Sequence, residues 1–284
     1  MVNIESLSFK DQQLEKKYHD LKEIIAELDS AAVAFSGGVD STLLLKVTAD
    51  ILTEGVIAVT SKSETYPQEQ QEKAQEIAAE IGVEQVLIYT EELASENFAQ
   101  NSPDRCYHCK KELFNEVKEV AQKRNITTVL DGSNYDDIDD YRPGLKALKE
   151  LSIRSPLLEA KLNKKDIRKL SKKLKLPTWD KASFACLSSR FPYGDKITSE
   201  KLLRVDAAEK FLRDFAFKQL RVRHHDNDTA RIEVLPEDME IFLTKREEIV
   251  AKLKELGYTY ITLDLEGYRT GSMNEVLSEE EKLT

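Results

Sequence analysis

The sequence predicts an α/β protein, in which a parallel sheet with helices on both faces is followed by a smaller α+β domain. Over most of the chain, short apolar runs alternate with segments whose apolar residues have helical spacing. This alternation is typical of parallel strands connected by helices. From about residue 195 the order changes to helix, strand, strand, helix, strand, which favours a small α+β domain. We therefore predict one domain over residues 1–194 and a second over residues 195–284.

The elements of the first domain follow from its periodicity. Helices are predicted at residues 9–29, from residue 39 onward, from Pro67 to about Gly82, and at 110–124 and 163–175. Proline in the first turn and glycine just past the end are typical of a helix. Strands are predicted at residues 31–35, 56–60, 86–89 and 127–130, with 156–158 as a last strand.

In the second domain, helices are predicted at residues 198–214 and 236–256, and strands at 219–224, 230–235 and 258–265. Strand alternation places Arg221 and Arg223 on one face of the first strand. Two neighbouring arginines suit a phosphate or carboxylate, because their planar guanidinium groups match its oxygens. The alternative is a pair of solvated arginines on an edge strand.

Composition restricts the class of protein. The 284 residues are 40% hydrophobic and 33% charged, which is enough for two globular cores. No apolar run reaches the length of a membrane span and no signal peptide is evident, so we expect a cytoplasmic protein without membrane contacts. The net charge of −10 argues against a large nucleic-acid interface. The basic stretch at 161–175 is more typical of a solvated helix face than of a binding patch. For Trp179, the only tryptophan, we expect packing in a core or an interface.

Residues 36–42, with the sequence SGGVDST, lie between the first strand and the next helix. Two glycines let the backbone approach a phosphate, and the first amides of the helix attract an anion. Asp40 is a candidate ligand for the magnesium that accompanies a nucleotide. Because ligands bind at the carboxyl ends of parallel strands, we expect ATP here, beside residues 61–64 and 131–134. Ser61 and Gly132 are then candidate ATP-binding residues, with the adenine near the end of the second strand. The alternative is a Ser/Gly-rich loop that only caps the helix.

Three cysteines offer thiol chemistry. Cys106 and Cys109 begin a predicted helix, so their sulfurs share one face. They could form a redox dithiol, half of a zinc site, or part of an iron–sulfur site. A thioredoxin-like site does not fit, because the motif does not follow a first strand; zinc would need a further ligand, and His108 faces away. With Cys186, three thiolates could hold a [4Fe–4S] cluster and leave one iron open.

Residues 36–42 resemble the PP-loop of the ATP pyrophosphatases. This loop and four further motifs together resemble the LarE family of ATP-dependent sulfur transferases, which build the nickel-pincer nucleotide cofactor. The resemblance covers almost the whole length of the chain. The further motifs are DG at 131–132, YRPG at 141–144, CLSSRFPYG at 186–194 and GYRTGSMN at 267–274.

The resemblance implies a two-stage reaction. ATP adenylates a carboxylate of pyridinium-3,5-biscarboxylic acid mononucleotide and releases pyrophosphate; sulfur then displaces AMP to give a thiocarboxylate, and both steps repeat at the second carboxylate. Some family members give up the sulfur of the cysteine matching Cys186, which becomes dehydroalanine. Others bind a [4Fe–4S] cluster through three cysteines. Because this chain has Cys106 and Cys109 as well, it resembles the second branch.

The resemblance also implies residue roles, and homo-oligomers that act on a small molecule and can work with other enzymes of nickel-pincer cofactor synthesis. ATP and Mg²⁺ are expected on the loop, and the substrate's phosphate on the two arginines of the second domain. Glu209 and Asp264 match acidic positions near the substrate, although either could be a structural ion-pair partner. The implied sites are Ser36, Gly37, Gly38, Ser41 and Thr42 for the ATP phosphates, Asp40 for magnesium, Cys106, Cys109 and Cys186 for the cluster, Lys110 and Arg190 for charge near the acyl-adenylate, and Arg221 and Arg223 for the substrate phosphate.

Three alternatives remain open at this point. One is another PP-loop enzyme, either an amide-forming synthetase, which would not need the cysteines, or a tRNA thiolase, which would need a basic surface. Another is an adenine-nucleotide sensor without chemistry, which would need neither thiols nor the arginine pair. The last keeps the sulfur-transfer reaction but has zinc as the metal and Cys186 as a sacrificial donor.

Overall fold

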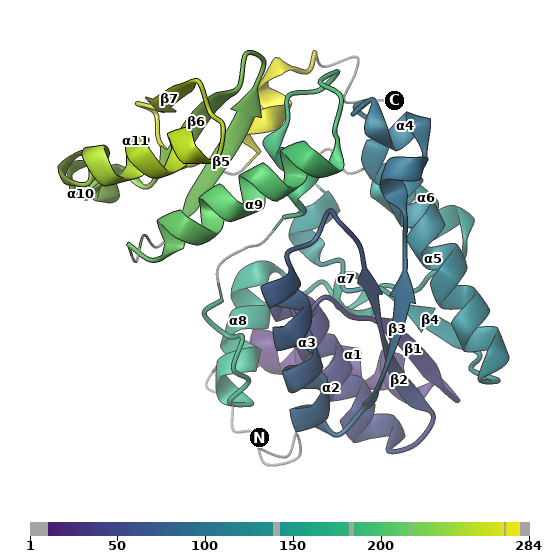
Figure 1. Cartoon of the computed structure of the whole chain (residues 1–284). Helices are drawn as coiled ribbons and strands as arrows, with labels where there is room; N and C mark the ends of the chain where they lie inside the picture. Colours follow the sequence, from purple (N-terminus) through teal and green to yellow (C-terminus); the bar gives the residue numbers. More distant parts are fainter. Residues whose placement is uncertain are drawn as a thin grey trace. The chain divides into compact units, whose positions relative to one another are not determined.

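The computed structural model describes residues 11–138, 143–181, 185–215, 217, 219–269 and 271–278. It divides into two compact units (Figure 1). Unit 1 groups residues 1–63, 68–90 and 106–184, and unit 2 groups residues 64–67, 91–105 and 185–284. This grouping does not test the predicted domain boundary after residue 194, which stays a prediction.

Unit 1 is built on a four-stranded parallel sheet, which confirms the predicted α/β class. The strand order is β3-β2-β1-β4, so the first strand of the chain lies inside the sheet. Ala31 of β1 is paired with Val56 on one side and with Thr128 on the other. The strands are β1 (Ala31–Ala34), β2 (Val56–Lys62), β3 (Glu84–Tyr89) and β4 (Thr128–Leu130).

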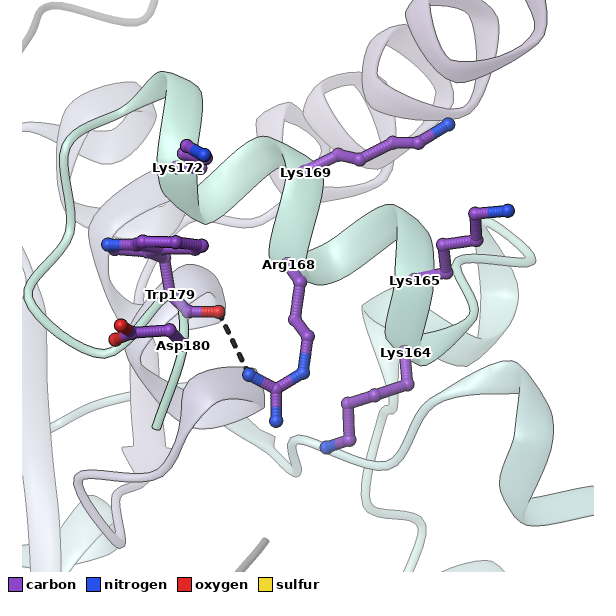
Figure 2. Close-up of a pocket in the computed structure, with 7 residues that line it drawn as sticks. All are labelled: Lys164, Lys165, Arg168, Lys169, Lys172, Trp179 and Asp180. Atoms are coloured by element: carbon purple, nitrogen blue, oxygen red, sulfur yellow. Dashed lines mark hydrogen bonds between the residues drawn. The ribbon is translucent and has the colours of Figure 1, made fainter. Parts of the chain in front are cut away.

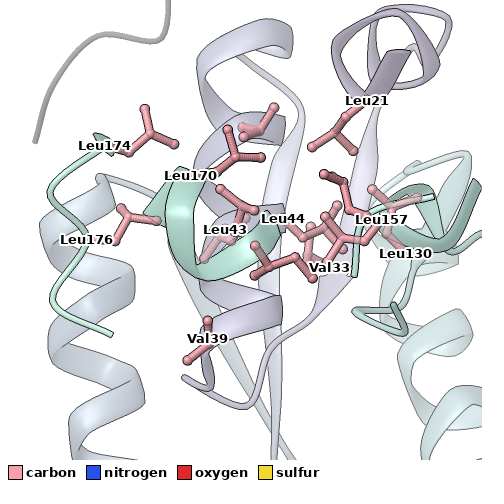
Figure 3. Close-up of a cluster of buried hydrophobic side chains, with 14 of the residues drawn as sticks. Leu21, Val33, Val39, Leu43, Leu44, Leu130, Leu157, Leu170, Leu174 and Leu176 are labelled. Atoms are coloured by element: carbon pink, nitrogen blue, oxygen red, sulfur yellow. The ribbon is translucent and has the colours of Figure 1, made fainter. Parts of the chain in front are cut away.

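Helices cover both faces of this sheet. Alternate residues of β1 therefore belong to two different apolar clusters. Ala31 and Val33 pack with α1, α2, α3, α7 and α8, in the cluster drawn in Figure 3. Ala32 packs instead with α5 and α6. Helix α2 is buried nearly all round, with Leu43, Leu44 and Leu45 fully inaccessible to solvent. The helices are α1 (Gln12–Ala26), α2 (Val39–Leu52), α3 (Gln68–Ile81), α5 (Arg105–Lys123), α6 (Gly144–Glu150), α7 (Pro156–Glu159) and α8 (Lys164–Lys173), with a 3₁₀ turn η3 (Tyr135–Ile138).

The predicted strand at residues 156–158 is wrong, because these residues begin helix α7. Pro156 occupies the first turn, where its missing N–H costs no hydrogen bond. The chain does touch the sheet just before this helix, where Arg154 forms a bridge with Leu130. The contact with the sheet is thus made by Arg154, outside the predicted strand.

Unit 2 contains a three-stranded mixed sheet packed against helices, as the predicted α+β domain requires. Strand β5 pairs antiparallel with β6, and β6 pairs parallel with β7. Its elements are η2 (Glu92–Ala94), α4 (Glu96–Ala99), η4 (Leu187–Arg190), α9 (Ser199–Arg213), β5 (Leu220–His225), β6 (Thr229–Val234), η5 (Pro236–Asp238), α10 (Met239–Thr244), α11 (Arg246–Glu255), β7 (Tyr260–Leu263) and η6 (Ser272–Val276). None of the described helices in either unit is long and apolar enough to cross a membrane.

The long helix predicted at 236–256 is interrupted. After the 3₁₀ turn η5, helix α10 ends at Thr244 and α11 begins at Arg246. Lys245 lies between them with a φ of −98° and a ψ of 6°, outside the helical region. The break lets Phe242 of α10 and Ile249 and Leu253 of α11 all reach the same apolar cluster.

The buried ring of His224 gives a pH-dependent prediction. It is 2% exposed and lies between the rings of Phe191 and Tyr258. Burial, with the nearby Lys201 and Arg204, lowers the pKa of His224 to about 4. Below about pH 6.5 the unfolded chain binds a proton that the folded chain resists, so stability decreases as the pH falls toward 4. NMR titration of the histidine rings should show His224 neutral at pH 5; a midpoint near 6.5 would contradict this burial.

Candidate active site

The turn from β1 to α2 has a backbone that only glycine fits. Gly37 has a φ of +64°, and a Cβ built on it would lie 2.9 Å from the Cβ of Ala74 on α3. Gly38 is the N-cap of α2 and supplies no side-chain cap. The first amides of α2 therefore keep their capacity to bind an anion.

Hydroxyl groups hold the turn in shape. The Oγ atoms of Ser36 and Ser41 lie 3.2 Å apart, and the backbone N–H groups of Ser36 and Gly38 donate to these two oxygens over 3.4 Å. Thr42 is fully buried in the first turn of α2. The predicted phosphate-binding residues thus form one small, polar turn at the carboxyl end of β1.

Asp40 carries an acceptor suited to a cation. Its Oδ2 is paired with the Nζ of Lys164, and its buried Oδ1 has no hydrogen-bond partner among the described residues. Burial raises the pKa of the Asp40 carboxyl, and Lys164 opposes that rise. A carboxylate oxygen without a partner beside a phosphate-binding turn fits a magnesium ligand.

The end of β4 packs directly against this turn, as predicted for residues 131–134. A Cβ on Gly132 would lie 3.3 Å from the backbone nitrogen of Ser41, so a larger residue would press on the turn. At the end of β2, Thr60 donates to the carbonyl of Phe35 over 2.7 Å, and the Ser61 hydroxyl contacts that of Thr90. The carboxyl ends of the strands therefore bring these polar groups to one edge.

Lys110 also reaches this edge, from helix α5. Its Nζ donates to the Oδ2 of Asp131 over 3.1 Å. Burial raises the pKa of Asp131, but Lys110 and the N–H of Ser133 outweigh it, so the carboxyl stays charged. Gly144 makes room for this lysine, because a Cβ there would lie 2.8 Å from the Lys110 Cδ.

Two lysines at the turn were missed by the sequence analysis. Lys164, at the start of α8, pairs with Asp40, and Lys181 donates to the carbonyl of Gly37 over 3.0 Å. Burial, with the nearby Lys73, lowers the pKa of Lys181. These contacts span 124 and 144 residues of sequence, so no local pattern could reveal them.

The cysteines fall in both units. Cys106 is exposed and Cys109 is half-buried in the first turn of α5, where a spacing of three places them on one face. The hydroxyl of Tyr107, which lies between the two cysteines, donates to the Glu150 carboxylate over 2.7 Å. The rings of Tyr107 and His108 are in edge-to-face contact. Cys186 belongs to unit 2 and precedes the turn η4. Among the described residues, no group of three or more His, Cys, Asp or Glu side chains is placed to hold a metal ion.

Arg190 holds the backbone around Cys186. The guanidinium donates to the carbonyls of Ala185 and Cys186 over 3.1 and 3.2 Å, and forms a two-pronged ion pair with Glu209 over 2.7 and 3.0 Å. Both side chains are almost completely buried. Burial favours their neutral forms, but the pair outweighs it, raising the pKa of Arg190 and lowering that of Glu209. Glu209 is therefore an ion-pair partner of Arg190, and a place near the substrate stays a prediction.

Arg221 and Arg223 lie on one face of β5, but both are buried rather than solvated. Arg223 forms a two-pronged ion pair with Glu233 over 2.9 and 2.8 Å. Arg221 donates to the carbonyl of Leu220 and lies against the ring of Tyr268. Burial and the nearby Arg190 lower the pKa of Arg221 to about 10. Burial is the main cause of this lowered pKa, so an anion that reached Arg221 would favour its charged form.

The remaining predicted residues are placed as follows. Asp264 follows β7 and pairs with Arg231. From the motifs named above, Tyr141, Arg142 and Thr270 lie outside the described residues.

A glycine-rich strand–loop–helix at the carboxyl edge of a parallel sheet, with the sequence SGGVDST, is the site of a PP-loop ATP pyrophosphatase, an enzyme that cleaves ATP between its α and β phosphates. In agreement, the asparagine synthase family matches residues 28–138. The chain is 39% identical over 272 residues to the pyridinium-3,5-bisthiocarboxylic acid mononucleotide synthase of Lactiplantibacillus plantarum, covering 95% of this chain and 98% of that protein. The chain therefore belongs to the LarE family of ATP-dependent sulfur-inserting enzymes.

Two uncharacterized proteins share this similarity. One, from Synechocystis sp., is 45% identical over 267 residues, 93% of this chain and 99% of that protein. The other, from Methanocaldococcus jannaschii, is 32% identical over 270 residues, 95% of this chain and all of that protein. The similarity thus extends through both units.

Replacing Gly37 by alanine should weaken ATP binding by about five- to 150-fold, because the positive φ and the clash of the added Cβ with Ala74 strain the turn by about 1–3 kcal/mol. Gly82→Ala is the matched control, since Gly82 also has a positive φ but nothing lies within 4 Å of its Cβ position. Calorimetric titration with ATP measures the difference. Equal affinities in the two variants would contradict the assignment of the turn.

Proposed function

We propose that this enzyme adenylates the carboxylates of pyridinium-3,5-biscarboxylic acid mononucleotide and converts them to thiocarboxylates for nickel-pincer nucleotide synthesis. The observation that carries the proposal is the PP-loop turn, in a chain that matches a bisthiocarboxylic acid mononucleotide synthase over 95% of its length. A cytoplasmic location and a homo-oligomer stay predictions.

In the first stage, a substrate carboxylate oxygen attacks the α-phosphorus of ATP, and pyrophosphate leaves. The turn at residues 36–38 and the N-terminus of α2 would hold the departing phosphates. Asp40 would hold Mg²⁺ through its free Oδ1, and Lys164 would then be released to face the phosphates. Lys110, fixed by Asp131 at the same edge, supplies positive charge for the acyl-adenylate.

In the second stage, sulfur attacks the acyl carbon, AMP leaves with the bonding electron pair, and a thiocarboxylate remains. Three thiols are a donor set that suits iron, so Cys106, Cys109 and Cys186 would hold a [4Fe–4S] cluster. When bound, such a cluster supplies a metal-held sulfide that is deprotonated at neutral pH.

The substrate's phosphate would bind at Arg221 and Arg223. Both guanidinium groups are buried, and Arg190 adds to the positive charge around Arg221. A phosphate dianion would stabilise the charged guanidinium of Arg221, whose pKa is lowered mainly by burial. Glu233 would keep Arg223 in place during this binding.

Asp40→Asn should reduce pyrophosphate release at least about a hundredfold, because a neutral amide cannot replace the carboxylate as a magnesium ligand. Asp166→Asn is the control, since Asp166 is also a partly buried carboxylate paired with a lysine, Lys17. Release is measured with ATP and the biscarboxylate substrate. Unchanged release in Asp40→Asn would contradict the proposed first stage.

Protein purified without oxygen should contain nearly equal amounts of iron and acid-labile sulfide, and Cys106→Ser should lose both while its AMP formation persists. Metal analysis and the visible spectrum measure this directly. Iron-free wild-type protein that loses hydrogen sulfide from Cys186 during turnover would instead establish the sacrificial mechanism. In that case Cys106 and Cys109 would have another role.

A further inference from the structure

Lys181 reaches the PP-loop turn of unit 1 from a part of the chain that is distant in sequence. Its Nζ donates to the carbonyl of Gly37 over 3.0 Å. Lys110 and Lys164, at the same edge of the sheet, are each ion-paired with an aspartate. Lys181, by contrast, forms no ion pair with any residue that the structure describes. A ligand can therefore bind Lys181 without first breaking an ion pair.

The surroundings of Lys181 favour an anionic ligand. The residue is half-buried, and burial, with the nearby Lys73, lowers the pKa of Lys181. Glu69, which is itself paired with Lys73, opposes this effect only in part. The carbonyl of Gly37 accepts a hydrogen bond but has no net charge. An anion on the turn would therefore favour the charged form of the lysine.

The backbone of Lys181 is held in place from helix α8. Arg168 donates to the carbonyls of Trp179 and Lys181 over 3.0 and 2.7 Å, and Figure 2 shows the first of these bonds. The N–H of Lys181 donates to the carbonyl of Thr178 over 3.0 Å. Trp179, expected above to pack in a core or an interface, is half-buried in this segment. Because both polar groups of its backbone are engaged, Lys181 extends to the turn from a fixed position before any ligand arrives.

We propose that Lys181 is a further catalytic residue, which binds the β-phosphate of ATP and stabilises the departing pyrophosphate. This assignment rests on the first stage of the proposed function. When a carboxylate oxygen forms its bond to the α-phosphorus, the bond from that phosphorus to the bridging oxygen breaks, and the bonding electron pair leaves with pyrophosphate. The β-phosphate therefore gains negative charge, which an ammonium group already positioned at the turn stabilises. Lys164 can contribute in this way only after it has left Asp40.

The experiment compares ATP with AMP, which lacks the β- and γ-phosphates. Lys181→Gln should weaken the binding of magnesium-ATP at least about tenfold, since it removes a charged hydrogen-bond donor, and should leave the affinity for AMP unchanged. Lys181→Arg, which keeps the charge, should restore most of the affinity for ATP. Calorimetric titration of the whole chain measures both ligands without the second substrate. A residue that only maintained the shape of the turn would affect ATP and AMP alike.

The matched control is Lys118→Gln. Lys118 lies on α5 in the same unit and also donates to a backbone carbonyl, that of Leu151, over 3.2 Å, so its replacement removes the same charge and the same kind of hydrogen bond. This variant should bind ATP like the wild type. Equal weakening in the two glutamine variants would show only a general charge effect and would overturn the proposal. An unchanged ATP affinity in Lys181→Gln, an equal loss of AMP affinity, or failure of Lys181→Arg to recover ATP binding would also overturn it.

A turnover assay separates this proposal from the proposed function. With ATP and the biscarboxylate, Lys181→Gln should release pyrophosphate at least about tenfold more slowly than the wild type. Release at the wild-type rate would overturn the role of Lys181 and leave the proposed function standing. If the wild type adenylates no pyridinium biscarboxylate, the proposed function fails, whereas a selective loss of ATP binding in Lys181→Gln would still support the assignment of this lysine.

Discussion

The close approach of the turn at Gly37 to helix α3 is the constraint on which the nucleotide site depends. Its positive φ and the contact with Ala74 fix the direction in which the chain leaves β1. Helix α2 then enters the core, where Leu43, Leu44 and Leu45 are fully buried, so its N-terminus cannot shift. The anion-binding amides are therefore held in place by apolar packing before any ligand arrives, and little reorganisation opposes binding.

Unit 2 differs from unit 1 in burying several charged side chains. Arg190 with Glu209 and Arg223 with Glu233 are two-pronged pairs in which nearly every side chain is inaccessible to solvent. Breaking such a pair leaves a buried charge without compensation, at a cost of about 3–5 kcal/mol. The pairs thus specify how η4, α9 and the sheet pack together.

Sequence periodicity was sufficient to predict most strands and helices, because the pattern of each element depends on residues that are close in sequence. It failed at residues 156–158, where a short apolar run fits either state and Pro156 decided for the helix. The turn at 36–42 was recognisable from its own residues. Lys164 and Lys181 were not, since only the fold brings them to it, and the pairing of Arg223 with Glu233 likewise depends on strand register.

Arg190 holds residue 186 by its carbonyl oxygen and not by its side chain. The hydrogen bond of this anchor is therefore the same in every chemical state of the sulfur, and a thiolate adds only its electrostatic attraction to the guanidinium. A thiol, a metal-bound thiolate or a side chain that has lost its sulfur altogether would present the same backbone oxygen to the same guanidinium. A protein that had lost this sulfur would consequently keep the native path of the chain here.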